Sequence, residues 1–333
     1  AAKQISHMLK YPTATKVESF FGGKFNILEV IINENSILNG ISLIDSKKII
    51  DFPSLVCLVE RKGEVFVPRG NYVFNVGDKV HITAANKNLK KFYKLLGNKD
   101  NLEKKITSSL VIGGGKIAHY LIEFLQIANF YLKVIEIDKN KAISLSESFP
   151  DIDVIWADGS DRDTLIEEGI QTFDSCISLT GFDEENIIIN LYADKLGIKK
   201  TVAKVNRASL KQIAEDIGQY SYITPKEIVG NIITKYTKSL QCSKHSDIEN
   251  FYRIANNQAE VIEFKITNNS AKILGIKLKD LSINPNMLIA FIIRNNKQIF
   301  PNGDDEIKLD DNVVVVSYKH KIEHIDDIIS RGQ

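Results

Sequence analysis

Residues Leu110–Asp138 read LVIGGGKIAHYLIEFLQIANFYLKVIEID, and this stretch decides the fold. A short apolar run ends in three glycines, a helical pattern follows, and a second apolar run ends in Glu136. Strand, glycine turn, helix, strand and acid is the order typical of a unit that holds a dinucleotide. The stretch therefore predicts an α/β, Rossmann-like domain with a parallel sheet.

Each part of this unit has a physical task. Gly113 allows a tight turn out of the first strand, and Gly115, which lacks a Cβ, lets a pyrophosphate approach the backbone. The following helix directs free N–H groups and the positive end of its dipole at phosphates. Glu136 lies 18 residues after Ala118, near the spacing expected for the acid that bonds a ribose hydroxyl and repels a 2′-phosphate. The pattern favours NAD or an adenine nucleotide over NADP; the alternative is a domain whose glycines serve packing only.

Apolar strand patterns and helical patterns continue to alternate over residues 139–223, which predicts right-handed crossovers in a parallel sheet. Ligands of such sheets bind beyond the carboxyl ends of the strands, so strand-end residues become candidates. Lys116 can neutralise phosphate charge, and Asp158 can contact the adenine or its ribose. The candidate nucleotide-binding residues are Gly113, Gly114, Gly115, Lys116, Ile117, Glu136, Asp158, Thr180 and Lys204.

Two of these candidates have an equally good structural interpretation. Asp158 lies in Ala157-Asp158-Gly159-Ser160, which also fits a plain turn followed by a helix that Ser160 caps and that runs through Glu168. Lys204 fits a solvent-exposed strand end. Both alternatives stay open at the level of sequence.

The composition is that of a globular protein with two or three domains: 333 residues, 44% hydrophobic and 26% charged. Its 43 basic and 42 acidic residues leave a net charge of +1, which gives no support for nucleic-acid binding. No apolar run approaches the ~20 residues that cross a bilayer. Cys57, Cys176 and Cys242 form neither a metal-ligand cluster nor a disulfide framework, which fits a reducing cytoplasm.

Two segments that flank the glycine turn resemble each other. The first contains FNILEVIINENSILNGISLID and VCLVERKGEVFVPRGNYVFNVGDKVHIT, and the second contains AEVIEFKITNNSAKILGIKLKDLS and IAFIIRNNKQIFPNGDDEIKLDDNVVVVS. Pro68 and Pro301 lie 233 residues apart, as do Asp78 and Asp311. Such duplication indicates repeated structural units. Each copy predicts a small α+β domain with a strand, a small glycine-containing helix and a β-hairpin.

The repeat sets the expected domain boundaries: a first small domain at 15–95, the nucleotide-binding domain at 105–240 and a second small domain at 245–330. Amphipathic helical patterns precede both copies, at 1–14 and 226–241. Because the second of these ends the nucleotide-binding domain, residues 1–14 are expected to be the helix of an earlier nucleotide-binding domain that this chain lacks. The Lys- and Asn-rich stretch Lys90–Lys105 is expected to be a solvated linker.

The segments VIGGGKIAHYL, VIEID, ADGSD and LTGFDEENI resemble the Trk-type potassium-uptake regulatory proteins of the RCK/KTN family. The flanking copies resemble that family's C-terminal ligand-sensing domain, so the resemblance covers essentially the whole chain. It implies a cytoplasmic gating subunit, peripheral on the inner face of the cell membrane, and no enzyme. It further implies exchange of NAD(H) or ATP/ADP, self-association into dimers or higher rings, a Trk-type integral-membrane potassium transporter as partner, and a second small-molecule effector on the small domains.

The resemblance also assigns roles by position. Gly113, Gly115 and Lys116 match the family's phosphate turn, Glu136 its ribose acid, and Asp158 and Thr180 its strand-end positions around the nucleotide. Some members carry a Glu directly after the proline of the segment matching Thr224-Pro225-Lys226, where it helps to bind a divalent cation. Lys226 occupies that position here, so no metal site is expected. The alternative function is an NAD-dependent oxidoreductase, which needs an acid–base residue beside the nicotinamide; the flanking copies contain no evident constellation of that kind.

Overall fold

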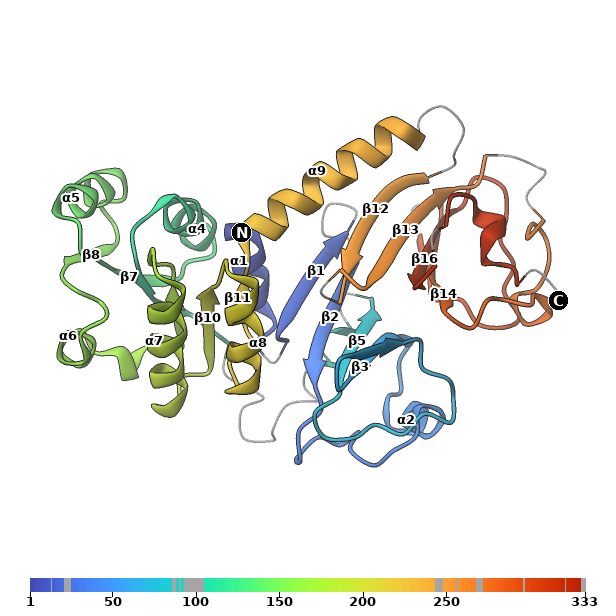
Figure 1. The fold of residues 1–333 in the computed structure, drawn as a ribbon, viewed down its shortest axis with the longest axis horizontal. Coiled ribbons are helices and arrows are strands. Elements are labelled where there is room, and N and C mark those ends of the chain that lie inside the picture. Colours follow the sequence, from blue (N-terminus) through green and yellow to red (C-terminus); the bar gives the residue numbers. More distant parts are fainter. Residues whose placement is uncertain are drawn as a thin grey trace. The chain divides into compact units, whose positions relative to one another are not determined.

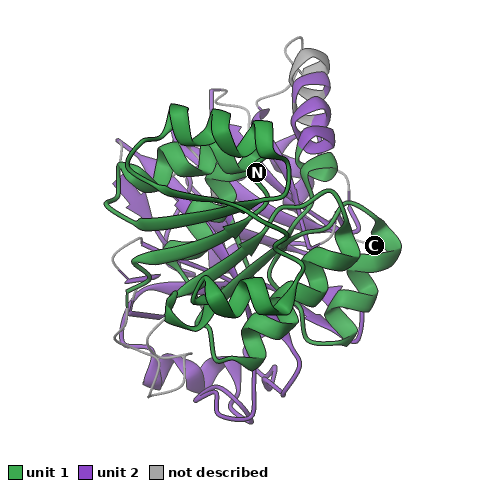
Figure 2. Cartoon of the chain, turned by 90° about the vertical axis from the view of Figure 1, so that its left-hand side faces the viewer, with its two compact units in different colours: residues 1–17, 97–228 green, residues 18–96, 229–333 purple. Residues whose placement is uncertain are grey.

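The chain forms two compact units, residues 1–17 with 97–228 and residues 18–96 with 229–333 (Figure 2). No helix in the described part of the chain is both long enough and apolar enough to span a bilayer. The computed structural model describes residues 1–12, 14–20, 25–85, 88–89, 91–92, 105–242, 248–255, 257–267, 272–295, 297–320 and 322–330.

The first unit is built around a six-stranded parallel sheet in the order β11-β10-β9-β6-β7-β8, with helices on both sides (Figure 2). The strands are β6 (Ser108–Ile112), β7 (Tyr131–Glu136), β8 (Asp153–Trp156), β9 (Ser175–Ser178), β10 (Lys200–Lys204) and β11 (Tyr222–Ile223). The helices that follow them are α4 (Lys116–Gln126), α5 (Lys139–Ser148), α6 (Arg162–Glu167), the 3-10 turn η3 (Ile170–Thr172), α7 (Asp183–Lys195), α8 (Ala208–Asp216) and α9 (Pro225–Cys242). Only the start of α9, up to residue 228, belongs to the first unit. The predicted Rossmann-like parallel sheet is confirmed.

Helix α4 forms because its apolar residues share one face. Ala118, Leu121, Ile122 and Leu125 recur at helical spacing, and all four are buried. Gly115 precedes the helix with extended backbone angles and serves as its N-cap without a side-chain bond. The first turn of α4 is therefore left uncapped at the end of β6, where its backbone N–H groups remain available.

The cap of helix α6 differs from the sequence-based expectation. Asp161, not Ser160, is the N-cap, and its carboxylate accepts from the amides of Asp163 and Thr164 (both 3.4 Å). Ser160 instead donates its own amide (2.9 Å) and its hydroxyl (2.7 Å) to Asp158 Oδ1. The prediction that Ser160 starts the helix is wrong because the amide and hydroxyl of Ser160 both donate to Asp158, two residues earlier in the loop.

Helix α1 (Ala2–Lys10) belongs to the first unit and packs against α4 (Figure 1). Ile5, Met8 and Leu9 form its buried face. The segment that leaves α1 is held by Lys200, at the start of β10, whose ammonium donates to the carbonyls of Pro12 (3.1 Å) and Ala14 (2.7 Å). One buried cation thus ties this segment to the sheet.

The second unit contains two five-stranded sheets with the same strand order, β1-β2-β5-β3-β4 and β12-β13-β16-β14-β15. This equivalence confirms two copies of one small α+β domain. The first copy comprises β1 (Lys16–Phe20), β2 (Phe25–Ile31), α2 (Leu43–Ile49), β3 (Ser54–Arg61), β4 (Glu64–Phe66) and β5 (Lys79–Ala84). The second comprises β12 (Ile248–Ile254), β13 (Ala259–Lys265), η4 (Leu278–Asp280), β14 (Met287–Arg294), β15 (Lys297–Ile299), β16 (Asn312–Tyr318) and η5 (Ile325–Ile328).

The small helix expected in both copies is shorter in the second. In the first copy, Ser42 caps α2 by accepting from the amide of Asp45 at 3.1 Å. The equivalent residue is Lys277, which precedes η4 and makes no side-chain cap bond. Because Lys277 provides no cap acceptor, a single 3-10 turn replaces the α-helix there. The expected linker Lys90–Lys105 falls almost entirely outside the described residues.

One hydrophobic cluster contains residues of both small domains. Phe25 of β2 and Phe291 of β14 lie with ring centroids 3.7 Å apart and are both buried. Cys57 and Leu58 of the first copy and Val314 and Val316 of the second belong to the same cluster. The second unit is therefore a joined pair of sheets.

Candidate functional site

The glycine turn lies where the ends of three neighbouring strands meet. The amide of Gly113 donates to the carbonyl of Ile135 at the end of β7 (2.8 Å), and the amide of Leu179, after β9, donates to the carbonyl of Ile112 (2.7 Å). Gly113 has φ +97°, and a Cβ there would lie 3.0 Å from the carbonyl carbon of Leu179. Glycine is required at this position by conformation and by space.

Glu136 is drawn into this turn. Its Oε2 accepts from the amide of Gly114 (2.6 Å), and its Oε1 accepts from the amide of Asp138 (2.8 Å). The residue is only 6% exposed. Each carboxylate oxygen retains a second lone pair, so the acid that braces the turn can still accept a bond from a ribose hydroxyl.

The start of α4 forms the open part of the site. A Cβ on Gly115 would meet nothing within 4 Å, in contrast to Gly113. Lys116 is exposed and Ile117 is half-buried, both in the first turn of the helix. The unpaired N–H groups and dipole of that turn attract an anion, and Lys116 adds a full positive charge.

Asp158 lies on the loop after β8, and its carboxylate accepts from Ser160, as the turn interpretation expects. The neighbouring Gly159 is buried, and a Cβ there would lie 2.5 Å from Cγ2 of Ile112. Close packing of Gly159 on the end of β6 therefore holds Asp158 at the rim of the sheet. The side chain of Asp158 is exposed and can bind a ligand in addition to serving the turn.

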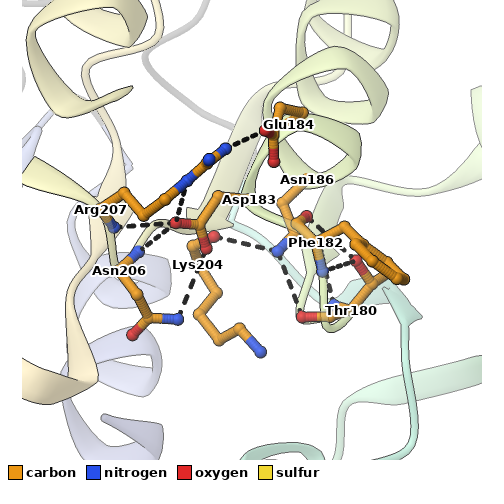
Figure 3. A network of polar contacts seen from close by, with 8 residues as sticks. All are labelled: Thr180, Phe182, Asp183, Glu184, Asn186, Lys204, Asn206 and Arg207. Carbon is orange, nitrogen blue, oxygen red and sulfur yellow. Dashed lines mark hydrogen bonds and ion pairs between the residues drawn. The ribbon is translucent and has the colours of Figure 1, made fainter. Parts of the chain in front are cut away.

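Thr180 is positioned by Asn186, a fully buried residue of α7 (Figure 3). Asn186 Oδ1 accepts from the amide of Thr180 (2.9 Å), and Nδ2 donates to the carbonyl of Lys204 (2.9 Å). The Lys204 ammonium donates to the carbonyl of Leu179 (3.3 Å), and burial lowers its pKa while Asp183 partly opposes that shift. The ends of β9 and β10 are thereby locked together, and Lys204 is half-buried, which contradicts the alternative of an exposed strand end.

A second polar network fixes the loop after β10 (Figure 3). The buried carboxylate of Asp183 accepts from the amides of Asn206 and Arg207, both at 2.8 Å. The Arg207 guanidinium also contacts Glu184. Two acidic side chains in the first turn of α7, Asp183 and Glu184, are thus already bonded to the loop after β10.

The structure brings most of the candidate residues to one rim. Gly113, Gly114 and Glu136 are in direct contact, and Thr180 and Lys204 are linked through Asn186 and Leu179. Gly115, Lys116 and Ile117 follow the same turn, and Asp158 lies on an adjacent loop held through Gly159. Among the described residues, no group of three or more His, Cys, Asp or Glu is placed to hold a metal ion.

The sequence analysis missed Asn186 and Gly159. Asn186 and Asn190 recur at i and i+4 within the isoleucine-rich helix α7, and both are fully buried. The signal in the sequence was two side-chain amides, four residues apart, among isoleucines such as Ile187 and Ile189, because a buried amide needs hydrogen-bond partners. Gly159 gave no signal of its own, because a glycine after an aspartate also fits an ordinary turn.

Comparison with known families accounts for both parts of the chain. A model described as the TrkA-N domain matches residues 109–225, which hold the glycine turn and the parallel sheet. A model described as the TrkA-C domain matches twice, over residues 27–97 and 261–330. The two matches to the TrkA-C domain fall on the two copies of the repeat.

Individual relatives extend this likeness over the whole chain. The Trk system potassium uptake protein TrkA homolog of Archaeoglobus fulgidus is 26% identical over 98% of this chain and 71% of its own length. The Trk system potassium uptake protein TrkA of Haemophilus influenzae is 25% identical over 98% of this chain and 70% of its own length. A solved structure described as the GsuK channel bound to NAD matches with a TM-score of 0.51 and 15% identity, over 95% of this chain and 55% of that one, which shows a shared fold.

These matches confirm the expected family and, with it, a regulatory protein in place of the alternative oxidoreductase. The chain belongs to the TrkA family of potassium-uptake proteins, with one TrkA-N domain between two TrkA-C domains.

Proposed function

We propose that this chain binds NAD(H) or ATP/ADP at the rim formed by the glycine turn and Glu136, and thereby regulates a Trk-type membrane potassium transporter from the cytoplasmic face. The observation that carries the proposal is the open backbone at Gly115 beside the braced acid at Glu136. The TrkA relatives, which are named for potassium uptake, and the GsuK channel, which shares the fold and was solved with NAD, support it.

Each part of the rim is proposed to bind a different part of the nucleotide. The backbone of Gly113, Gly114 and Gly115 and the first turn of α4, with Lys116 and Ile117, receive the phosphates. Glu136 accepts a bond from the adenosine ribose and repels a 2′-phosphate, and Asp158 contacts the adenine side. Thr180 and Lys204, at the ends of β9 and β10, border the part of the ligand that extends beyond the glycine turn.

Helix α7 can couple this site to assembly. Its first turn is bonded to the rim through Asn186 and Asp183, while in its second turn Ile188 is 65% exposed. Ile213 and Ile217 of α8 are exposed as well. Exposed apolar side chains of this size favour self-association. A nucleotide that shifts the ends of β9 and β10 would then change how copies pack, provided it binds the two arrangements with different affinity.

Calorimetric titration of the purified chain with NAD, NADH, ATP and ADP tests the site. Gly115→Asp should abolish or strongly weaken binding, because a carboxylate would occupy the phosphate position and repel it. Gly230→Asp is the matched control, since Gly230 of α9 is equally open and adopts no positive φ. Failure of every nucleotide to bind the unmodified chain would refute the proposal, as would equal affinity in Gly115→Asp.

The assembly and the partner need separate measurements. Sedimentation with and without nucleotide should show a change in oligomer size, and Ile188→Glu should suppress self-association while leaving nucleotide affinity intact. Co-purification of the tagged protein from its own membranes should recover a Trk-type potassium transporter, and transport assays with and without the chain should differ. Recovery of no membrane transporter would contradict the regulatory role.

A further inference from the structure

The strand order predicts where the second half of a dinucleotide would lie. Along the rim, Glu136 ends β7, the glycine turn follows β6, Thr180 follows β9, and Lys204 ends β10. If the adenosine ribose is on Glu136 and the pyrophosphate at the glycine turn, any group linked beyond the phosphates extends over β9 and β10. This step rests on the proposed function.

The surface at that position contains an exposed aromatic ring on a fixed backbone. Phe182 is 65% exposed, directly after Thr180-Gly181. Its amide donates to Thr180 Oγ1, and its carbonyl accepts from that hydroxyl (both 3.2 Å) and from the amide of Asn186 (3.1 Å) (Figure 3). A rigid loop that holds a phenyl ring in water provides a preformed stacking surface.

The charges around Phe182 indicate which kind of ligand group, a phosphate or a flat ring, would bind next to its side chain. Asp183, Glu184 and Glu185 follow it directly, while Lys204 and Arg207 are the cations bonded within this network. Arg207 is already bonded to Glu184 and Lys204 to the carbonyl of Leu179, and Glu185 adds a further carboxylate, so an additional phosphate gains little there. A flat ring is favoured, and the positively charged ring of oxidised nicotinamide gains a cation–π attraction as well.

We propose that the ends of β9 and β10 form a half-site for the nicotinamide ring, with Phe182 as its stacking surface, so that this chain prefers NAD(H) to ADP or ATP. Lys204 borders the half-site through its bond to the carbonyl of Leu179, and Asn186 fixes the loop. Phe182 is a specificity-determining residue in this arrangement and contributes nothing to the adenosine half.

The test compares affinities of NAD, NADH, ADP and ATP for the unmodified chain, Phe182→Ala and Phe182→Tyr. Stacking of this kind is worth about tenfold in affinity, so Phe182→Ala should weaken NAD and NADH by about that factor and change ADP by less than twofold. Phe182→Tyr should retain the preference. Phe124→Ala is the matched control, because Phe124 is an exposed phenylalanine two turns into α4, away from the rim.

Each outcome is decisive. Unchanged NAD affinity in Phe182→Ala, or an equal loss for NAD and ADP, would overturn the half-site while leaving nucleotide binding established. Lys204→Met should affect ATP no more than NAD; a selective loss of ATP would instead place a third phosphate at this position and overturn the proposal. Absence of binding by all nucleotides would refute the proposed function itself and the half-site with it.

Discussion

Glu136 and Gly114 are joined by a hydrogen bond of 2.6 Å from the Gly114 amide to the carboxylate, so the acid at the end of β7 braces the glycine turn after β6. The other carboxylate oxygen accepts from Asp138 at 2.8 Å. This pair gives Glu136 a structural task and a ligand-binding task together. Substitutions at Glu136 must therefore be judged on ligand preference and on stability.

We expect Glu136→Gln to weaken NAD binding and to reduce the discrimination against NADP. The amide keeps the shape but removes the negative charge that repels a 2′-phosphate, so the NAD/NADP affinity ratio should fall by about tenfold, the equivalent of about 1.4 kcal/mol. Titrations with both dinucleotides measure the ratio. Asp153→Asn, at the opposite end of the sheet, is the control and should leave the ratio unchanged. A constant ratio in Glu136→Gln would place the ribose elsewhere.

Gly113→Ala should mainly lower the unfolding free energy, whereas Gly115→Ala should mainly lower the affinity for nucleotide. Alanine at position 113 must adopt φ +97° and contact Leu179, which should cost about 1–3 kcal/mol of unfolding free energy. Alanine at position 115 meets open space and should change stability by less than about 1 kcal/mol, yet weaken nucleotide binding. Urea unfolding followed by Trp156 fluorescence reports on the first unit, because the chain has one tryptophan. Equal stability of the two variants would contradict the assignment.

The glycine turn and Glu136 could be predicted from sequence because their signal is local: residue types at fixed spacing within one βαβ unit. The duplicated small domains could be predicted from the sequence as well, since their apolar patterns repeat. The N-cap of α6 could not be predicted, because Asp161 and Ser160 are both residue types that cap helices well. The choice between them depends on the bond from Ser160 to Asp158. The roles of Asn186 and Gly159 and the contact between Phe25 and Phe291 depend on residues distant in sequence, which no local pattern specifies.

The two copies of the repeat contain equivalent ion pairs between an arginine and a buried aspartate. Arg61 donates to Asp78 from Nε (2.6 Å) and Nη2 (2.7 Å), and Arg294 donates to Asp311 from Nε (2.8 Å) and Nη2 (2.7 Å). Both carboxylates are buried. Burial raises the pKa of Asp78, but hydrogen bonds from Arg61 and other donors outweigh this effect and lower the pKa overall.

Asp78→Ala and Asp311→Ala should each destabilise the second unit by about 3–5 kcal/mol, because each leaves a guanidinium without its buried partner. Asp304→Ala is the control: its pair with Lys279 is exposed and should contribute less than about 1 kcal/mol. Urea unfolding followed by circular dichroism measures the three variants. A loss at Asp78 or Asp311 no larger than the loss at Asp304 would contradict the prediction.

Lys200 should make the stability of the first unit depend on pH. Its ammonium is buried and donates to the carbonyls of Pro12 and Ala14 and to Ser221 Oγ (2.7 Å). Burial lowers the pKa of Lys200 to about 7, although the nearby carboxylate of Asp194 opposes the shift. In the unfolded chain the pKa of a lysine is about 10.4. Between these two values the unfolded state binds more protons than the folded state.

The unfolding free energy should therefore rise as the pH increases through about 7, by about 1 kcal/mol between pH 7 and pH 8, because deprotonation removes the cost of a buried charge in the folded state. Well below pH 7 the lysine is protonated in both states and contributes no further slope. Lys200→Met removes the titration, so subtracting its pH profile from that of the unmodified chain isolates the contribution of Lys200. Urea unfolding by Trp156 fluorescence between pH 6 and 9 gives both profiles. Parallel profiles would mean that Lys200 keeps its proton throughout this range, held by the two carbonyls that tie α1 to the sheet.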